Sequence, residues 1–175
     1  LEAGDGVGGR VRTDLVDGYR LDRGFQILLT AYPEVQRVLE LDALDLRPFA
    51  PGAVVRIDDR SWTVADPFRA PRHVVDTVRA PIGSVTDKAR LLALVRTATR
   101  GTVPELLRTP DTTTLDLLRA RGFSPAMVDR FWRPLFAGIQ LDPDLDVSAR
   151  RFLLILRMLA TGAAVVPARG MGAIT

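Results

Sequence analysis

The sequence contains no cysteine among its 175 residues, which excludes disulfides, iron–sulfur clusters and thiolate metal sites. His73 is the only histidine, so a metal site built from several histidine ligands is excluded as well. The lack of cysteine also fits a reducing compartment. We therefore expect a cytoplasmic protein.

Long hydrophobic runs are also missing. The most apolar run, residues 152–160, is interrupted by Arg157 and falls far short of the roughly 20 residues that a membrane-spanning helix needs. The N-terminus is acidic and glycine-rich, unlike a secretory signal. The 24 basic and 21 acidic residues are interspersed, whereas a nucleic-acid-binding face needs clustered positive charge. No nucleic-acid partner is expected.

The composition that remains is that of a globular protein, with 47% hydrophobic and 26% charged residues. Residues 11–22 predict a β-hairpin that turns at Asp17-Gly18, and residues 54–64 predict a second one around Asp58-Asp59-Arg60. A helix is expected over residues 32–41, with Pro33 in its first turn. A short strand is expected over residues 163–166.

From residue 71 to residue 162 the pattern is helical. The expected helix starts are Ser84 or Thr86, Thr113, Ser124-Pro125 and Ser148, and the expected stops are Gly101, Gly122 and Gly162. The helix that opens at Ser124 must break or kink at Pro134, because proline lacks an N–H and its ring collides with the preceding turn. The sequence therefore predicts an α+β (mixed) fold, mostly helical, with short antiparallel strands.

The first residues include Gly4-Asp5-Gly6-Val7-Gly8-Gly9, which satisfies the dinucleotide pattern G-x-G-x-x-G. A genuine pyrophosphate loop follows a strand and opens a helix. Here only three residues precede Gly4, and residues 10–13 are strand-like. We therefore expect that this pattern is not a pyrophosphate loop. The alternative, which we do not favour, is a nicotinamide-binding domain that uses residues 4–9 as its pyrophosphate loop.

A different assignment fits the chemistry of these residues better. Glu2 ends a short apolar run, where an acidic residue accepts hydrogen bonds from ribose hydroxyls. Gly8 and Gly9 allow close approach of the backbone to a dinucleotide. Arg10 supplies a fork of donors for phosphate or flavin oxygens.

This order resembles the flavin-binding segment of the superfamily that contains FAD-dependent amine oxidases, phytoene desaturases and protoporphyrinogen oxidases. The usual form is E-A-x-x-R-x-G-G-R, then a hairpin, then D-x-G. Gly6 departs from it, because the family commonly carries an arginine there. The matching positions are Glu2, Ala3, Gly8, Gly9, Arg10, Asp22 and Gly24.

Two downstream segments continue the resemblance. Residues 131–139 are similar to the family's F-x-R-P-F-x-x-G-V region, which Leu141-Asp142 and Ser148 extend. Residues 167–171 are similar to its P-x-G-G-M turn, with Arg169 in place of a glycine. The resemblance therefore covers nearly the whole chain.

The resemblance implies an FAD-dependent oxidoreductase that moves a hydride from a C–H or C–N bond of an apolar or amine substrate to flavin. It implies that residues 1–30 are a partial FAD-binding segment, an edge piece of a Rossmann-like domain, and that residues 31–175 are a mainly helical substrate (cap) domain. The implied cofactor-binding residues are Glu2, Gly8, Gly9, Arg10, Gly24, Phe25 and Gln26, the last three beside the flavin ring.

The family's pyrophosphate loop and C-terminal flavin segment have no counterpart in this chain. We therefore expect an internal fragment of a larger flavoenzyme, inactive by itself and binding FAD weakly or not at all. Apolar faces left exposed on such a fragment would favour a homodimer. The alternative is a non-enzymatic helical interaction module, in which the glycine segment is only a turn.

No catalytic residue can be assigned. Lys88 lies in no matching motif and is interpreted as a solvated helix residue, and His73 as a surface or hydrogen-bonded core residue. Arg150 and Arg151 form either a solvated helix start, which we favour, or a peripheral membrane contact. Six apolar residues would line a substrate cavity or, as their helical spacing favours, fill a core: Phe131, Trp132, Phe136, Phe152, Leu156 and Met158.

Overall fold

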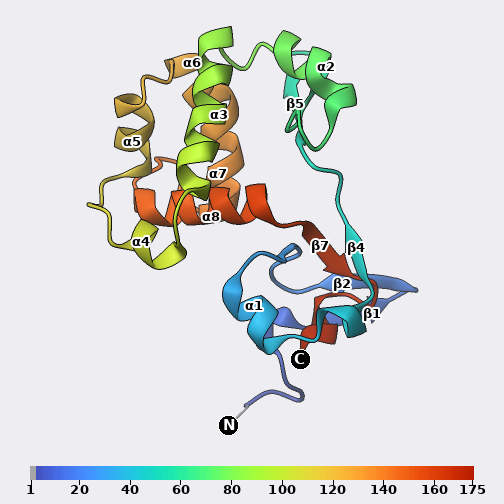
Figure 1. The fold of residues 1–175 in the computed structure, drawn as a ribbon. Coiled ribbons are helices and arrows are strands. Elements are labelled where there is room, and N and C mark those ends of the chain that lie inside the picture. Colours follow the sequence, from blue (N-terminus) through green and yellow to red (C-terminus); the bar gives the residue numbers. More distant parts are fainter. Residues whose placement is uncertain (1–2) are drawn as a thin grey trace. The chain divides into compact units, whose positions relative to one another are not determined.

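The computed structural model describes residues 3–175, which form two compact units (Figure 1). Unit 1 consists of Leu1–Ala50 and Thr161–Thr175, and unit 2 consists of Pro51–Ala160. Helices and short antiparallel sheets are both present, which confirms the predicted α+β class. The expected division into a partial FAD-binding segment, residues 1–30, and a mainly helical substrate domain, residues 31–175, stays a prediction.

The first predicted hairpin is confirmed in unit 1. Strands β1 (Thr13–Val16) and β2 (Tyr19–Asp22) are antiparallel, with Val16 opposite Tyr19. Their two-residue turn, Asp17-Gly18, has φ of 51° and 81°. Two positive φ angles are typical of a type I′ turn, whose twist matches that of the strands it joins.

A three-stranded sheet forms the rest of unit 1, with β7 in its centre and antiparallel to both neighbours. The strand expected over residues 163–166 is thereby confirmed. The helix expected over residues 32–41 is confirmed as well, but it ends at Val38. The elements are β3 (Leu28–Leu29), α1 (Pro33–Val38), η2 (Leu41–Leu44), β4 (Leu46–Pro48), β7 (Ala164–Pro167) and η5 (Met171–Ile174).

Unit 2 begins with the second predicted hairpin, β5 (Ala53–Ile57) and β6 (Arg60–Val64), and continues as helices. Helix α8 runs across the ends of α3 and α7 (Figure 1). The helical elements are η3 (Pro71–His73), α2 (Val74–Arg79), α3 (Val85–Thr99), α4 (Val103–Leu107), α5 (Thr114–Ala120), α6 (Pro125–Met127), η4 (Val128–Trp132), α7 (Arg133–Gln140) and α8 (Ala149–Thr161).

The helix starts follow the predicted caps. The side chains of Ser84, Thr113 and Ser124 each accept a hydrogen bond from a backbone N–H in the first turn of the helix that follows. Of the two candidates for α3, Ser84 is the cap. Such a bond satisfies one of the N–H groups that have no partner inside the helix.

The helix that opens at Ser124 does not break at Pro134. Elements α6, η4 and α7 are continuous, and the stretch immediately before α7, Val128–Trp132, is π-helical. A π turn widens the ring of backbone atoms, which accommodates a residue that has no N–H and a ring that would crowd the preceding turn. Of the two predicted outcomes, a break or a kink, the break is wrong, and a local π distortion precedes Pro134 instead.

The core of unit 2 is built around Trp132, which is fully buried. Its ring lies 5.6 Å from that of Phe123, 5.1 Å from that of Phe131 and 5.3 Å from that of Phe152. These edge-to-face pairs add to the stabilisation from apolar burial. The six apolar residues of helices η4, α7 and α8 considered for a cavity are all buried, so the core interpretation is confirmed.

A buried carboxylate joins two helix starts in unit 2. Asp87 is fully buried and accepts hydrogen bonds from the backbone N and Oγ of Ser84 and of Ser124, at 2.8 to 2.9 Å. Burial, the largest single influence, raises the pKa of Asp87, but these four bonds outweigh it and lower the pKa from 3.8 to about 2. The ionised form therefore holds the starts of α3 and α6 together.

We expect Asp87→Asn to lower the free energy of unfolding of unit 2 by about 3 kcal/mol, because an amide cannot accept all four charge-assisted bonds. Urea denaturation followed by tryptophan fluorescence measures this, since both tryptophans, Trp62 and Trp132, lie in unit 2. Asp144→Asn is the matched control, because Asp144 is exposed. Equal losses in both variants would contradict the proposed role of Asp87.

The same carboxylate predicts an acid dependence of stability. Its pKa in the folded state, about 2, lies below the ordinary value of 3.8. Its contribution is therefore complete above the ordinary value and is lost as the pH falls toward 2. Urea midpoints measured between pH 5 and about 2 should fall more steeply for the natural chain than for Asp87→Asn. Parallel curves would exclude Asp87 as the titrating group.

Candidate functional site

The glycine pair in unit 1 adopts a backbone that other residues rarely reach. Gly8 has φ of 103° and Gly9 has φ of 50°. Only a short 3₁₀ turn, η1 (Gly9–Val11), follows before β1, so no α-helix opens after Gly9. The strand–loop–helix context that a pyrophosphate loop requires is therefore not present after Gly9, which agrees with the sequence prediction.

The backbone at this turn is open to a ligand. A Cβ at Gly9 would meet no atom within 4 Å, and Arg10 is exposed. Within residues 3–175, the Arg10 guanidinium has no hydrogen-bond partner. A guanidinium presents forked donors that suit oxygen acceptors.

The second predicted segment lies against the first. A Cβ at Gly24 would lie 2.2 Å from the backbone oxygen of Arg10, so only glycine fits there. The structure thus brings Gly24, Phe25 and Gln26 next to the Gly8-Gly9-Arg10 turn, and the last two are exposed. The contact of these residues with a flavin stays a prediction. The predicted ribose-binding residue, Glu2, lies outside the described residues.

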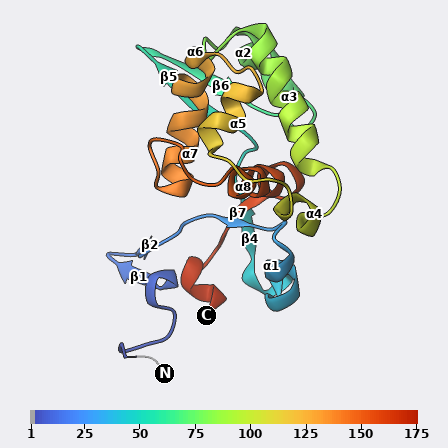
Figure 2. The same ribbon diagram turned by 90° about the vertical axis from the view of Figure 1, so that its left-hand side faces the viewer.

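Asp22 connects this region to the other end of the chain. Its Oδ1 accepts hydrogen bonds from the Thr13 hydroxyl and from the Met171 backbone N, the latter at 2.9 Å. The Thr13 hydroxyl in turn accepts from the Gly172 backbone N at 2.8 Å. Figure 2 shows η5 beside the β1–β2 hairpin as a result. The sequence identified Asp22 as a position that matches the family motif, but it did not indicate that Asp22 binds Thr13 and Met171.

A hollow of about 400 Å³ opens beside this junction in unit 1. Two arginines line it. Arg12 pairs with Asp5, and this bond lowers the pKa of the Asp5 carboxyl, while Arg169 is exposed and has no partner within residues 3–175. The lining residues are Val7, Arg12, Thr13, Arg169, Gly172, Ala173 and Thr175. The sequence analysis had not identified Arg12 as a site residue.

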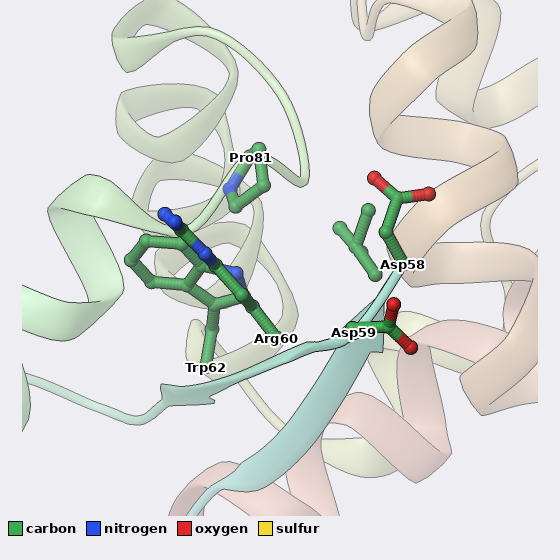
Figure 3. A pocket seen from close by; sticks show the side chains of 6 residues that line it. Asp58, Asp59, Arg60, Trp62 and Pro81 are labelled. Atoms are coloured by element: carbon green, nitrogen blue, oxygen red, sulfur yellow. The ribbon is translucent and has the colours of Figure 1, made fainter.

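A second hollow, of about 390 Å³, lies at the tip of the β5–β6 hairpin in unit 2. Figure 3 shows the carboxylates of Asp58 and Asp59 on one side and Arg60, Trp62 and Pro81 on the other. The two carboxylates belong to the exposed turn between the strands. No residue that the resemblance implicates in cofactor binding lines this hollow.

Lys88 is not the solvated residue that the sequence suggested. It is half-buried, and its Nζ donates to the backbone oxygens of Val78 at 2.6 Å and Ala80 at 2.8 Å. Burial lowers the pKa of Lys88. These oxygens lie at the C-terminal end of α2, where helix carbonyls lack partners. Lys88 therefore has a structural role, and its solvated interpretation is wrong.

His73 and Arg150, two further residues considered from the sequence, have ordinary hydrogen-bonding surroundings. His73 is half-buried and accepts a hydrogen bond from Arg72 Nε at 3.0 Å. Arg150 donates to Asp111 at 3.1 Å and to the Leu107 backbone oxygen at 2.7 Å, so its charge is compensated within unit 2. These contacts fit the interpretation of a helix start.

In residues 3–175, no three metal-ligating side chains lie close enough together to hold an ion. None of the helices described there has the length and apolar character required to cross a membrane.

The family model of the flavin containing amine oxidoreductases matches residues 1–175, the whole chain. The chain belongs to this family. No curated protein and no solved structure matches it. Membership makes a flavin the expected cofactor and an oxidoreductase the expected class of enzyme, so the interaction-module alternative loses its support. The family residues also fit a flavin here, because the open Gly9 backbone and the unpaired donors of Arg10 face no other described group.

The hydrogen bonds at Asp22 predict a local effect of a substitution in unit 1. We expect Asp22→Ala to raise the exchange rates of the Met171 and Gly172 backbone amides by about tenfold, because the first loses its acceptor and the second loses a fixed Thr13 hydroxyl. Hydrogen exchange followed by NMR measures each amide.

Asp14→Ala is the control for that experiment. Asp14 lies on the same hairpin and pairs with Arg23 at 2.7 Å, away from the C-terminal segment. Its removal should leave both amides protected. If Asp22→Ala also leaves them protected, the carboxylate is not what holds the two segments together.

Proposed function

We propose that the protein carrying this chain is an FAD-dependent oxidoreductase that removes a hydride from a C–H or C–N bond of an apolar or amine substrate. Family membership supports the flavin and the oxidoreductase class. The observation that carries the assignment to this region is the packing of Gly24 on the Arg10 backbone oxygen, which brings two glycine segments into one open surface.

The residues of this surface have distinct roles in the proposal. The N–H groups of Gly9 and Arg10, with the Arg10 guanidinium, bind oxygens of the cofactor. Gly24, Phe25 and Gln26 lie beside its ring, and the exposed Phe25 shields an apolar face from water. Glu2 accepts hydrogen bonds from the ribose. When bound, FAD supplies the electron-accepting chemistry, so the protein needs no nucleophile of its own.

The substrate side of the proposal rests on family membership rather than on a cavity. The buried aromatic residues of η4, α7 and α8 pack against one another and leave no room for a substrate among them. An apolar or amine substrate would therefore contact other surfaces. The class of bond in the proposal rests on membership in a family of amine oxidoreductases and not on a catalytic side chain.

The first prediction from the proposed function concerns the cofactor itself. Protein expressed from the complete gene that encodes this chain should release stoichiometric FAD on denaturation, seen by absorption and fluorescence. Arg10→Gln should weaken FAD binding by about tenfold, because charge-assisted hydrogen bonds are lost. Arg20→Gln is the control, since Arg20 is exposed on β2 and lies outside the proposed site. Protein without flavin, and without uptake on titration, would contradict the proposal.

The second prediction concerns an apolar face of unit 1. The side chains of Val16, Tyr19 and Leu21 lie on one face of the β1–β2 hairpin, and their exposed fractions are 46%, 72% and 52%. We propose that this face is covered in a homodimer of the 175-residue chain. Sedimentation velocity should then show a dimer, which Tyr19→Glu dissociates. A monomer at all concentrations would contradict the homodimer.

A further inference from the structure

The hollow at the tip of the β5–β6 hairpin is lined by charges of both signs. Its lining includes two carboxylates, those of Asp58 and Asp59, and one guanidinium, that of Arg60. Figure 3 shows the carboxylates on one side of the hollow and Arg60 on the other. The volume of about 390 Å³ lies within the range of pockets that bind small molecules. A ligand in this hollow would therefore meet one negative side and one positive side.

Only one of the two carboxylates has a partner among the described residues. Nη2 of Arg56 lies 3.6 Å from Oδ1 of Asp59 and compensates its charge. The Asp58 carboxylate and the Arg60 guanidinium have no partner within residues 3–175, although a single residue separates them in the chain. The hollow thus keeps one negative and one positive charge that do not reach each other.

The rest of the lining is apolar and comes from Ile57, Trp62 and Pro81. All three residues are half-buried, and Ile57 and Trp62 pack against the core of unit 2. An aromatic ring beside aliphatic groups binds a hydrocarbon chain through apolar burial. The hollow therefore combines two separated opposite charges with an apolar contact surface.

Both sides of the hollow are held in place by hydrogen bonds. Ile57 and Arg60 are directly opposite each other in the β5–β6 ladder, so the turn between them is closed by the strands. On the other side, Nη1 of Arg130 donates to the backbone oxygen of Pro81 at 2.9 Å. A preformed site loses less free energy to ordering when a ligand binds.

We propose that this hollow binds a small zwitterion, an amino carboxylate whose ammonium and carboxylate groups are joined by an apolar chain. The ammonium pairs with Asp58, the carboxylate pairs with Arg60, and the chain packs against Trp62. Because Asp58 and Arg60 do not reach each other, the two charges of the ligand are separated as well. None of the residues proposed to bind flavin lines the hollow, so this site is independent of the proposed function.

Titration of the 175-residue chain with ε-aminocaproate, followed by heteronuclear NMR, tests the site. The chain has two tryptophans, so its spectrum contains two indole N–H signals, which Trp62→Phe assigns. The Trp62 signal should shift in a saturable manner, whereas that of the fully buried Trp132 should stay in place. Glycine, whose two charges are adjacent, should shift neither signal. A Trp62 signal that ε-aminocaproate leaves unchanged overturns the proposal.

Two probes with one charge each test whether both sides of the hollow take part. Hexylamine keeps the ammonium of ε-aminocaproate, and hexanoate keeps its carboxylate, on a chain of similar length. Each should bind about fivefold more weakly than the zwitterion, because each lacks one ion pair and exposed ion pairs are weak. If either probe binds as tightly as ε-aminocaproate, one of the two charged side chains is not used, and the zwitterion proposal is overturned.

Substitutions then assign each charge of the ligand to one side chain. Asp58→Asn should weaken the binding of ε-aminocaproate and hexylamine by about fivefold and leave hexanoate unchanged. Arg60→Gln should weaken the binding of ε-aminocaproate and hexanoate and leave hexylamine unchanged. A side chain that only supports the hairpin would instead affect all three probes alike.

Asp144→Asn and Arg96→Gln are the matched controls for these substitutions. Both residues are exposed in unit 2, and neither lines the hollow. Circular dichroism verifies that each variant is folded. If Asp58→Asn and Arg60→Gln bind the three probes as the controls do, the hollow is not a zwitterion site.

Discussion

The hydrogen bonds to the Asp22 carboxylate join two segments that lie 149 residues apart in the chain. An isolated two-stranded hairpin is only marginally stable in water, so β1 and β2 need an attachment beyond their own ladder. Asp22 and Thr13 provide it by fixing the backbone of Met171 and Gly172. The glycine turn before β1 and the hollow beside it take their shape from this junction. The candidate cofactor surface therefore depends on a part of the chain far from the motif that identifies it.

A buried carboxylate has the same function in unit 2. Asp87 joins the starts of α3 and α6. Trp132, at the centre of the aromatic core, follows the start of α6 along the chain. Burial of a charge is costly unless hydrogen bonds compensate it, and four bonds do so here. In each unit, an acidic side chain thus joins segments that are distant in sequence.

The sequence by itself determined the features that depend on local chemistry. The Asp17-Gly18 turn, the caps Ser84, Thr113 and Ser124, and the absence of a helix after Gly9 follow from the φ preferences and hydrogen-bonding groups of neighbouring residues. The family also follows from the sequence, since the family model matches residues 1–175.

The tertiary structure decided what depends on contacts between distant residues. It placed β7 between β3 and β4, turned Lys88 onto the end of α2, and brought Arg12, Arg169 and Gly172 to one hollow. It also replaced the expected break at Pro134 by a π turn, because burial of the surrounding aromatic residues favours a continuous helix. Such outcomes depend on packing and on hydrogen bonds between residues that are distant in sequence. A local sequence pattern holds no information about these contacts.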